Sequence, residues 1–456
     1  MKLGSPLDQI DSARKLAAAG LALDSSARKA KLLAGSARAM TEAGASAEAD
    51  IAGYFVPGRI EVLGKHTDYA GGRSLLVAAD RGFCLLAAPR RDATVTMIDT
   101  AWQQRAQFEI TPDLAPAARH WSNYPMTVAR RLARNFGPGL RGADIAFASD
   151  LPAASGMSSS SALLVATFLA LAGVNRLSHR DEYRRNITGP ETLAEYLGTV
   201  ENGQSFGTLA GDKGVGTFGG SEDHTAMLCC GPDTMSQYSY CPVRFERRIK
   251  LPEGYTFAVA FSGVVAEKTG SALDKYNRAS ALAAAVAQAW RDATGRSDRH
   301  IAAALGSGPD AVNRIRQVLA NHSGGAFPAA DLLKRFEHFY AENEQIIPAA
   351  GDALASGDLA RFGRQVDLSQ EHTETLLGNQ VPETVFLARS ARELGAAAAS
   401  AFGAGFGGSV WAMVESRQAE QFLPDWSHRY HGKFPGPAAQ AKFFATQAGP
   451  AVFELK

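Results

Sequence analysis

The sequence predicts an α+β fold with more than one domain, and three observations carry this prediction. From residue 57 onward, short apolar or alternating runs between turns indicate strands, as in ATVTMID at 93–99. Beyond about residue 255, a strand is followed by long alanine-rich segments that indicate helices through about residue 395. The stretch AAAASAFGAGFGGSVWAMVES then has the pattern of a strand, a glycine-rich turn and a second strand.

The chain has 456 residues, which at roughly 150 residues per domain suffices for two or three domains, or two large ones. Residues 8–45 are rich in Ala, Leu, Lys and Arg and favour amphipathic helices, so we expect a helical N-terminal extension at 1–50 and domains at 51–250 and 251–456. Within the first domain we expect strands at 74–80, 83–89, 93–99 and 143–149, helices near 121–135 and at 190–203, and a glycine-rich loop at 205–221.

Composition narrows the class of protein. The 47 Lys and Arg residues nearly balance 46 Asp and Glu, so charge gives no reason to expect a nucleic-acid or acidic-membrane partner. Four cysteines without a C-x-x-C pair indicate reduced thiols rather than a disulfide framework. The N-terminus lacks the pattern of a secretory signal, and no apolar run is long enough to span a membrane. We therefore expect a cytoplasmic protein; the sequence does not indicate its oligomeric state.

The stretch SGMSSSSALL at 155–164 combines glycine and serines at the predicted start of an apolar helix. Backbone N–H groups and the positive end of the helix dipole are unpaired there, and glycine lets a phosphate approach closely. The alternative is ordinary helix capping by serine. Four consecutive serines exceed what capping needs, which favours an anion site. It is not a Walker-type loop, because no G-x-x-x-x-G-K-[ST] is present.

A second glycine-rich stretch, GAGFGGSV at 403–410, has four glycines in six positions between two apolar runs. Glycine is required where a ligand approaches the backbone closely or where a turn needs a positive φ. A turn needs only one or two such residues. Taken alone, the pattern does not distinguish a binding loop from a turn.

The third stretch, PGRIEVLGKHTDYAGGRSL at 57–75, gathers charged residues among glycines, and GGSEDH at 219–224 adds more. Asp68 and Asp223 are candidates for holding or deprotonating a hydroxyl, and Arg59 for stabilising developing negative charge. Each of these residues taken singly is more simply explained as a solvated loop charge.

Together and in this order, the three stretches resemble the motifs of GHMP kinases, and within that superfamily those of galactokinases. PGRIEVLGKHTDYAGG is similar to the galactokinase signature, SGMSSSSAL to the Gly-Leu-Ser-Ser-Ser phosphate motif, and GAGFGGSV to the third, glycine-rich motif. The resemblance implies a two-domain GHMP kinase fold with a mixed-sheet N-terminal domain, a ferredoxin-like C-terminal domain and the active site between them. It also implies ATP-dependent phosphorylation of a monosaccharide, with the anomeric 1-hydroxyl as the expected acceptor.

The resemblance assigns expected roles to matching positions. Arg59 corresponds to the arginine that supports phosphoryl transfer, and Asp223 to the aspartate of a Met-Asp-Gln motif that acts on the sugar hydroxyl. Glu201 corresponds to the glutamate that binds Mg²⁺ together with a serine hydroxyl, Ser159 or Ser160. Because LAGDKGVGTFGG looks like an insertion before SEDH, Glu222 is an alternative match to Asp223.

For the sugar, the resemblance points to Asp68, which would bind hydroxyls, and to Tyr276, which would line the pocket. His66 belongs to the same H-T-D-Y tetrad, although a lone histidine is more often structural. The residues expected to bind ATP are Gly156, Ser158, Ser159, Ser160, Ser161, Gly405 and Gly407, and those expected to bind Mg²⁺ are Ser160 and Glu201.

Position 65 departs from the family pattern. Galactokinases place an acid there that binds a sugar hydroxyl, whereas this chain has Lys65, and the signature's asparagine is replaced by Glu61. A lysine only donates hydrogen bonds, so Lys65 suggests a substrate carboxylate and hence a uronic acid such as galacturonate or glucuronate. Alternatively, Lys65 turns outward or pairs with Glu61, leaving galactose or another aldose as substrate, or it contacts a nucleotide or a sugar phosphate.

A different class of function is also open at this point. A galactokinase-like protein could bind ATP and sugar without catalysis and signal through a protein partner. The presence of Arg59, the serine motif and Asp223 favours catalysis instead. A kinase for a non-sugar alcohol, such as mevalonate or homoserine, is disfavoured by the H-T-D-Y tetrad.

Overall fold

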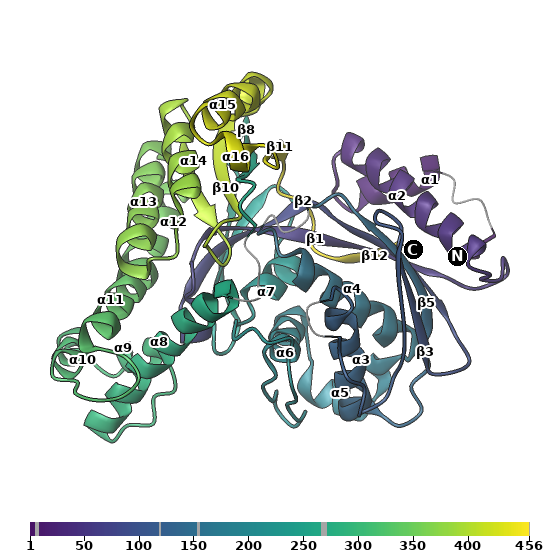
Figure 1. The fold of residues 1–456 in the computed structure, drawn as a ribbon, viewed down its shortest axis with the longest axis horizontal. Coiled ribbons are helices and arrows are strands. Elements are labelled where there is room, and N and C mark those ends of the chain that lie inside the picture. Colours follow the sequence, from purple (N-terminus) through teal and green to yellow (C-terminus); the bar gives the residue numbers. More distant parts are fainter. Residues whose placement is uncertain (5–8, 118–119, 153–155, 266–270, 456) are drawn as a thin grey trace.

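The computed structural model describes residues 1–4, 9–117, 120–152, 156–265 and 271–455, and these form two β-sheets with helices packed around them (Figure 1). The first sheet has eight strands in the order β12-β1-β2-β5-β3-β4, with β6 and β7 attached beside β2. Its strands are β1 (Ala52–Leu63), β2 (Arg73–Pro89), β3 (Thr94–Asp99), β4 (Gln104–Glu109), β5 (Ala143–Ser149), β6 (Thr234–Ser239), β7 (Arg244–Lys250) and β12 (Phe453–Leu455). Among the strands of this sheet that the structure describes, only β3 and β5 pair in parallel.

Helices cover both faces of this sheet, as Figure 1 shows. On one face lie α1 (Gln9–Ala18) and α2 (Leu23–Glu42), which form a core with alternate residues of β2 such as Cys84 and Leu86. The intervening Leu85 packs into the larger core on the other face. That face carries α3 (Asn123–Phe136), α4 (Ser159–Val174), α5 (Asp181–Asn186), α6 (Pro190–Asn202) and α7 (Glu222–Cys229). The predicted helical extension thus supplies the cover for one face of the sheet.

The structure corrects one prediction about the strands. Residues 74–80 and 83–89 were expected to be separate strands, but they form the single long strand β2. A Cβ atom at Gly82 would lie 2.2 Å from the carbonyl oxygen of Val56, so glycine lets β2 continue past an irregularity in its pairing with β1. The strands β4, β6 and β7 were not predicted individually.

The second sheet is antiparallel, with the strand order β11-β8-β10-β9, which is the ferredoxin-like arrangement that the resemblance implied. It consists of β8 (Tyr255–Phe261), β9 (Ala398–Phe402), β10 (Ser409–Glu415) and β11 (Lys442–Thr446). The helices that accompany it are α8 (Ser271–Thr294), α9 (Ile301–Leu305), α10 (Ala311–Ala320), α11 (Ala329–Tyr340), α12 (Ile347–Ala355), α13 (Leu359–His372), α14 (Pro382–Glu393), α15 (Ala419–Lys433) and α16 (Pro435–Ala438).

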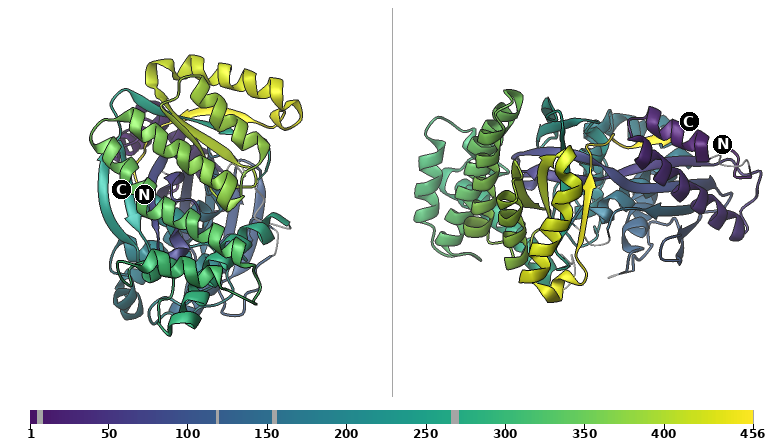
Figure 2. Two further views of the ribbon diagram at one scale, coloured as in Figure 1. Left: turned by 90° about the vertical axis from the view of Figure 1, so that its left-hand side faces the viewer. Right: turned by 90° about the horizontal axis from the view of Figure 1, so that it is seen from above.

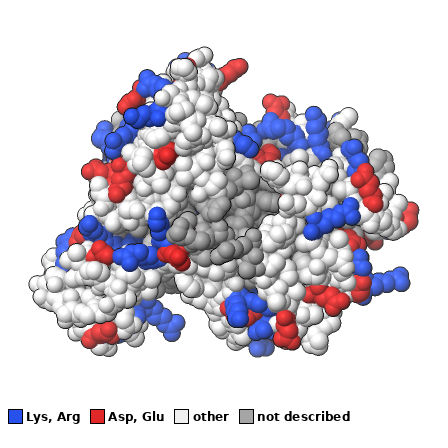
Figure 3. Space-filling model, in the orientation of Figure 1, with Lys and Arg blue, Asp and Glu red and all other residues white. Residues whose placement is uncertain are grey.

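The chain passes from the first sheet to the second between Lys250 and Tyr255 and returns at its end, where β12 pairs with β1. In Figure 2, α8–α13 lie at one end of the molecule and α1–α2 at the other. The described helices include none that is both long and apolar enough to cross a membrane. On the face drawn in Figure 3, basic and acidic side chains are interspersed.

Candidate active site

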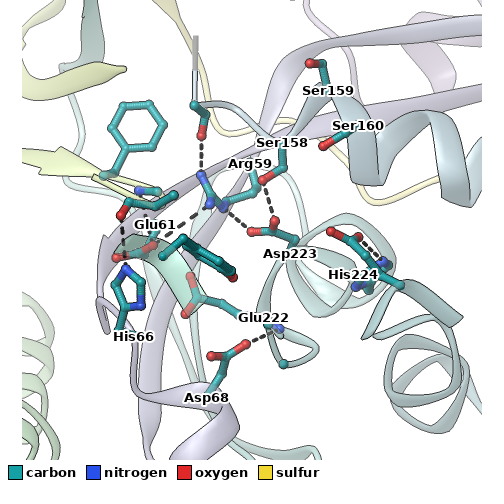
Figure 4. A pocket seen from close by; sticks show the side chains of 18 of the residues that line it. Arg59, Glu61, His66, Asp68, Ser158, Ser159, Ser160, Glu222, Asp223 and His224 are labelled. Atoms are coloured by element: carbon teal, nitrogen blue, oxygen red, sulfur yellow. Dashed lines mark hydrogen bonds and ion pairs between the residues drawn. The ribbon is translucent and has the colours of Figure 1, made fainter. Parts of the chain in front are cut away.

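A cavity of about 420 Å³ brings the sequence motifs together (Figure 4). Its walls come from β1 and the loop after it, the start of α4, the end of α6, the start of α7, helix α8 and the turn after β9. The lining residues are Arg59, Glu61, His66, Asp68, Tyr69, Tyr124, Gly156, Ser158, Ser159, Ser160, Glu201, Gly219, Gly220, Glu222, Asp223, His224, Val265, Tyr276, Phe402, Gly403 and Ala404. Both sheets therefore contribute to one site, with Phe402 and Gly403 coming from the second.

Arg59, on β1, is the cation at the centre of this cavity and is only 4% exposed. Its Nε donates to Asp223 Oδ1 at 2.6 Å, and its Nη1 donates to the carbonyl oxygen of Gly156 at 2.6 Å. Burial disfavours the charge, but the carboxylates of Asp223, Glu61 and Glu222 outweigh it and raise the pKa of Arg59. The guanidinium is thus a fixed, permanently charged group.

Asp223, near the start of α7, is the carboxylate that this arginine holds. Its second oxygen, Oδ2, accepts a hydrogen bond from Ser158 Oγ at 2.5 Å and a longer one from Ser161 Oγ at 3.4 Å. The sequence left Glu222 as an alternative match. In the structure, Asp223 accepts hydrogen bonds from both Arg59 and Ser158 and so connects β1 to the serine motif. The backbone N–H of Glu222 instead donates to Asp68.

The serine motif lies at the N-terminus of α4, and its hydroxyl groups differ in whether they face the cavity or are buried in the protein. Ser158 precedes the helix in the left-handed region, with φ +56°, a conformation that costs a non-glycine residue energy and that clusters at functional sites. Ser159 and Ser160 line the cavity at the first turn, where backbone N–H groups are unpaired within the helix. Ser161 is fully buried and donates to carboxylates instead. Ser155, the first motif residue, lies outside the described residues.

Glu201, at the end of α6, faces the serine motif across the cavity. Its Oε2 accepts from Ser161 Oγ at 2.9 Å and lies 3.4 Å from His224 Nε2. Ser161 thus contacts Glu201 directly, while Ser159 and Ser160, the serines expected to bind Mg²⁺ together with Glu201, line the same cavity. Thr217, from the apparent insertion, reaches Glu201 Oε1 at 3.4 Å. No group of three or more His, Cys, Asp or Glu side chains suited to a metal ion occurs among the described residues.

At the other end of the cavity lie the H-T-D-Y residues. Asp68 is buried and accepts backbone hydrogen bonds from Tyr69 at 2.8 Å and from Glu222 at 3.1 Å. Burial raises its pKa, and these N–H groups oppose that shift. His66 Nε2 lies 3.1 Å from the carbonyl oxygen of Ala404, and its ring lies 5.3 Å from that of Tyr276. Asp68, His66 and Tyr276 thus all line the same cavity.

The loop between β1 and β2, which carries His66 and Asp68, is held at both ends by a π-helical segment, η3 (Ala341–Ile346). Glu342 Oε1 accepts from the backbone N–H of Gly64 at 2.9 Å, and Asn343 Oδ1 accepts from that of Arg73 at 2.6 Å. π-Helical segments are rare and frequently occur at functional sites. Sequence reasoning missed this support, because it comes from a helix about 270 residues further along the chain.

Two glycines expected to bind ATP do not line the cavity. A Cβ atom at Gly405 would lie 2.4 Å from the carbonyl oxygen of Asn379, and one at Gly407 would lie 2.6 Å from that of Val264. These glycines also have positive φ, so they serve the turn between β9 and β10. The members of that turn that reach the cavity are Gly403 and Ala404.

Lys65 is also absent from the cavity wall, which corrects the prediction that it contacts the substrate. Its side chain is 0% exposed, and Nζ donates to Ser400 Oγ, on β9, at 2.9 Å. Ser400 in turn donates to Gln370 Oε1. Lys65 therefore does not turn outward and does not line the cavity, so the uronic-acid prediction loses the contact on which it depended.

Glu61, Glu222 and His224 line the cavity, although the sequence analysis gave Glu61 and His224 no role in binding and named Glu222 only as an alternative to Asp223. Each stands where a known motif has a different residue, namely the signature's asparagine and the methionine and glutamine of Met-Asp-Gln. That departure was the available signal. The sequence analysis used only the departure at Lys65 to predict specificity, whereas in the structure Glu61 and Glu222 line the cavity and Lys65 does not.

Comparison with known families and proteins agrees with this geometry. The galactokinase galactose-binding signature matches residues 42–89, the GHMP kinase N-terminal domain matches residues 123–207, and the GHMP kinase C-terminal domain matches residues 351–432. The fold is similar to that of a Lactococcus lactis galactokinase solved with galactose, with a TM-score of 0.73 at 21% identity, covering 91% of this chain and 98% of the other.

Curated relatives extend over most of the chain. A galactokinase from Roseiflexus sp. is 30% identical over 383 residues, which cover 82% of this chain and 86% of the relative. A galactokinase from Exiguobacterium sibiricum is 28% identical over 418 residues, covering 88% and 94%. The motifs in their order, the cavity that unites them and this extended similarity lead to one conclusion: the chain belongs to the galactokinase family of ATP-dependent sugar kinases.

Proposed function

We propose that the chain phosphorylates galactose at the anomeric 1-hydroxyl, with Mg²⁺ and ATP. The observation that carries the proposal is that the galactose-binding signature at 42–89 delivers His66 and Asp68 to the same cavity as the Arg59–Asp223 ion pair. A hydroxyl bound against Asp68 would then lie within reach of groups suited to phosphoryl transfer.

In this proposal, Asp223 would accept the proton of the sugar hydroxyl and orient it in line with the γ-phosphoryl group. Its hydrogen bonds from Arg59 and Ser158 support this role, because they fix the direction of the carboxylate. Arg59 would also stabilise negative charge on the phosphoryl group as it transfers. The geometry leaves this guanidinium in contact with the cavity.

The ATP phosphates would bind at the start of α4, where Ser159, Ser160 and the helix dipole face the cavity. Glu201 would hold Mg²⁺ there with a serine hydroxyl. One carboxylate is enough, because Mg²⁺ in kinases is bound by one or two carboxylates plus the substrate phosphates. The metal would neutralise phosphate charge during the transfer.

The test is ATP-dependent ADP release measured against galactose, glucose, arabinose, galacturonate and glucuronate, with and without Mg²⁺. We expect galactose to have the highest kcat/KM, and turnover to require Mg²⁺. Turnover confined to another sugar would contradict galactose as the substrate. If no sugar in the panel supports turnover while ATP and galactose both bind, the catalytic assignment itself fails and a sensor function replaces it.

A further inference from the structure

The sugar end of the cavity contains two buried carboxyl groups whose hydrogen-bonding capacity is unfilled. Glu61 is 3% exposed and Glu222 is 5% exposed, and both line the cavity. Neither Glu61 Oε1 nor Glu222 Oε1 has a donor partner among the described residues. A buried polar oxygen without a partner costs free energy, so a pair of them at the wall of a binding cavity points to a ligand.

The two carboxyl groups lie close enough for a hydrogen bond between them, and that bond requires that one of them is protonated. Burial, opposed by Arg59 and Lys65, raises the pKa of Glu61 to about 7. Burial together with the charges of Glu61 and Asp68 raises that of Glu222 well above its usual value. Two carboxylates in one site cannot both ionise without strong repulsion.

The surrounding charges indicate which member of the pair carries the proton. Glu61 lies near two cations, Arg59 and Lys65. Glu222 lies near Arg59 but also near the acids Asp68 and Asp223. Glu61 is therefore the ionised member, and Glu222 is the protonated donor. This gives Lys65 a role without substrate contact: behind the cavity wall, it keeps Glu61 charged.

Building on the function proposed above, we propose that Glu61 and Glu222 are specificity-determining residues that bind a hydrogen-bond-donating substituent of the sugar, a hydroxyl or a protonated amine, and exclude a carboxylate. A hydroxyl would donate to Glu61 and accept from Glu222. A protonated amine would find two acceptors, and the shared proton would leave to solvent. A substrate carboxylate would face Glu61 as a like charge in a desolvated site. This reverses the preference that Lys65 suggested from sequence.

The test compares galactose, galactosamine and galacturonate in the intact enzyme at saturating ATP, for the wild type and for Glu61→Gln and Glu222→Gln. We expect kcat/KM of the wild type for galacturonate to be at least about 10-fold below that for the preferred sugar. Each Gln variant should raise KM for the preferred sugar by about 5- to 100-fold with a smaller change in kcat, since a lost hydrogen bond to a charged group costs on this order. The ratio of galacturonate to preferred-sugar activity should rise in Glu61→Gln.

The comparison of galactose with galactosamine shows whether the donating substituent is a hydroxyl or a protonated amine, since the sugar with the higher kcat/KM carries the preferred donor. Glu222→Met and Glu61→Asn, which restore the residue types of the family motifs, provide second variants should either Gln variant fold poorly. ATP affinity and the thermal midpoint serve as controls for folding. Lys65→Met separates the two explanations of the lysine: a wild-type preference for galacturonate that disappears in this variant would overturn the proposal.

Unchanged KM and unchanged sugar discrimination in both Gln variants would also overturn the proposal while leaving a working sugar kinase. The two failures are thus distinguishable. If no sugar is phosphorylated, the proposed function fails, and calorimetric binding of the same three sugars to the same variants still decides the role of the pair.

Discussion

The two ends of the cavity differ in how their polar groups are satisfied. At the phosphoryl-transfer end, Asp223 accepts hydrogen bonds at both oxygens, and Arg59 is held by Asp223 and by the Gly156 carbonyl. At the sugar end, Glu61 and Glu222 each have a buried oxygen with no hydrogen bond from any described group other than the neighbouring carboxyl. Arg59, Asp223 and the serines at the first end match the residue types of the family motifs, whereas Glu61 and Glu222 depart from them. The difference teaches that protein groups hold Arg59 and Asp223 in place, whereas in our proposal a substituent of the sugar completes the hydrogen bonding of Glu61 and Glu222.

The largest effect on activity should come from a substitution at the phosphoryl-transfer end of the cavity. Asp223→Asn keeps the side-chain shape but removes the carboxylate, so the sugar hydroxyl loses its proton acceptor and Arg59 loses its counter-ion. We expect kcat to fall by about 10²- to 10⁴-fold, the usual contribution of a general base, with a smaller change in the KM for sugar. Steady-state ADP release measures both constants, and ATP affinity controls for folding. A kcat within about threefold of the wild type would contradict the role of Asp223.

A buried ion pair that does not line the cavity offers a contrast in stability rather than in activity. Lys29, on α2, is 0% exposed and donates to Asp150 Oδ2 at 2.5 Å. Lys29→Met leaves Asp150 without its counter-ion beneath the helices that cover the sheet. We expect the free energy of unfolding to fall on the order of 3 kcal/mol, as is typical when one partner of a buried pair is removed. Chemical denaturation measures this loss.

The matched control is Lys29→Met combined with Asp150→Asn, which leaves no unpaired charge and should recover part of the lost stability. KM for sugar should remain unchanged in both variants, since neither residue lines the cavity. A stability equal to that of the wild type in Lys29→Met would show that α2 is not held by this pair.

The smallest effect concerns the sugar end of the cavity and the way in which the stability of the protein depends on pH. The pKa of Glu61 is raised from 4.5 to about 7, chiefly by burial and also by the charge of Asp223. The charges of Arg59 and Lys65 and a hydrogen bond with Glu222 oppose this shift. The folded protein therefore binds this proton more tightly than the unfolded chain. The resulting stabilisation is complete below about pH 4.5 and is lost as pH rises through about 7.

We thus expect the wild type to lose about 1–3 kcal/mol of stability between pH 5 and pH 8 that Glu61→Gln does not lose, the size that a shift of this order allows. Urea denaturation at several pH values measures the difference between the two proteins, so that other titrating groups largely cancel. Parallel pH profiles for the two proteins would show that Glu61 titrates normally and would weaken the comparison between the two ends.

Much of the architecture follows from local pattern. The helix at 190–203 and the strand at 143–149 match α6 and β5 closely, because their caps, turns and apolar spacing are local. The joining of 74–80 and 83–89 into β2 was not predictable in this way. It depends on the backbone of β1 approaching Gly82, a contact between strands rather than a property of either segment.

The sequence by itself determined which residue types meet at the site: the motifs carrying Arg59, Asp68 and the serines have a fixed order and chemistry. Only the tertiary structure decided their direction. Lys65 follows a strand, and its partner Ser400 is 335 residues away, so packing of the second sheet against the first, rather than local geometry, turns the lysine into the protein. The same packing closes the cavity around Glu61 and Glu222. A buried side chain points where its charge and hydrogen bonds are satisfied, and those partners come from the whole fold.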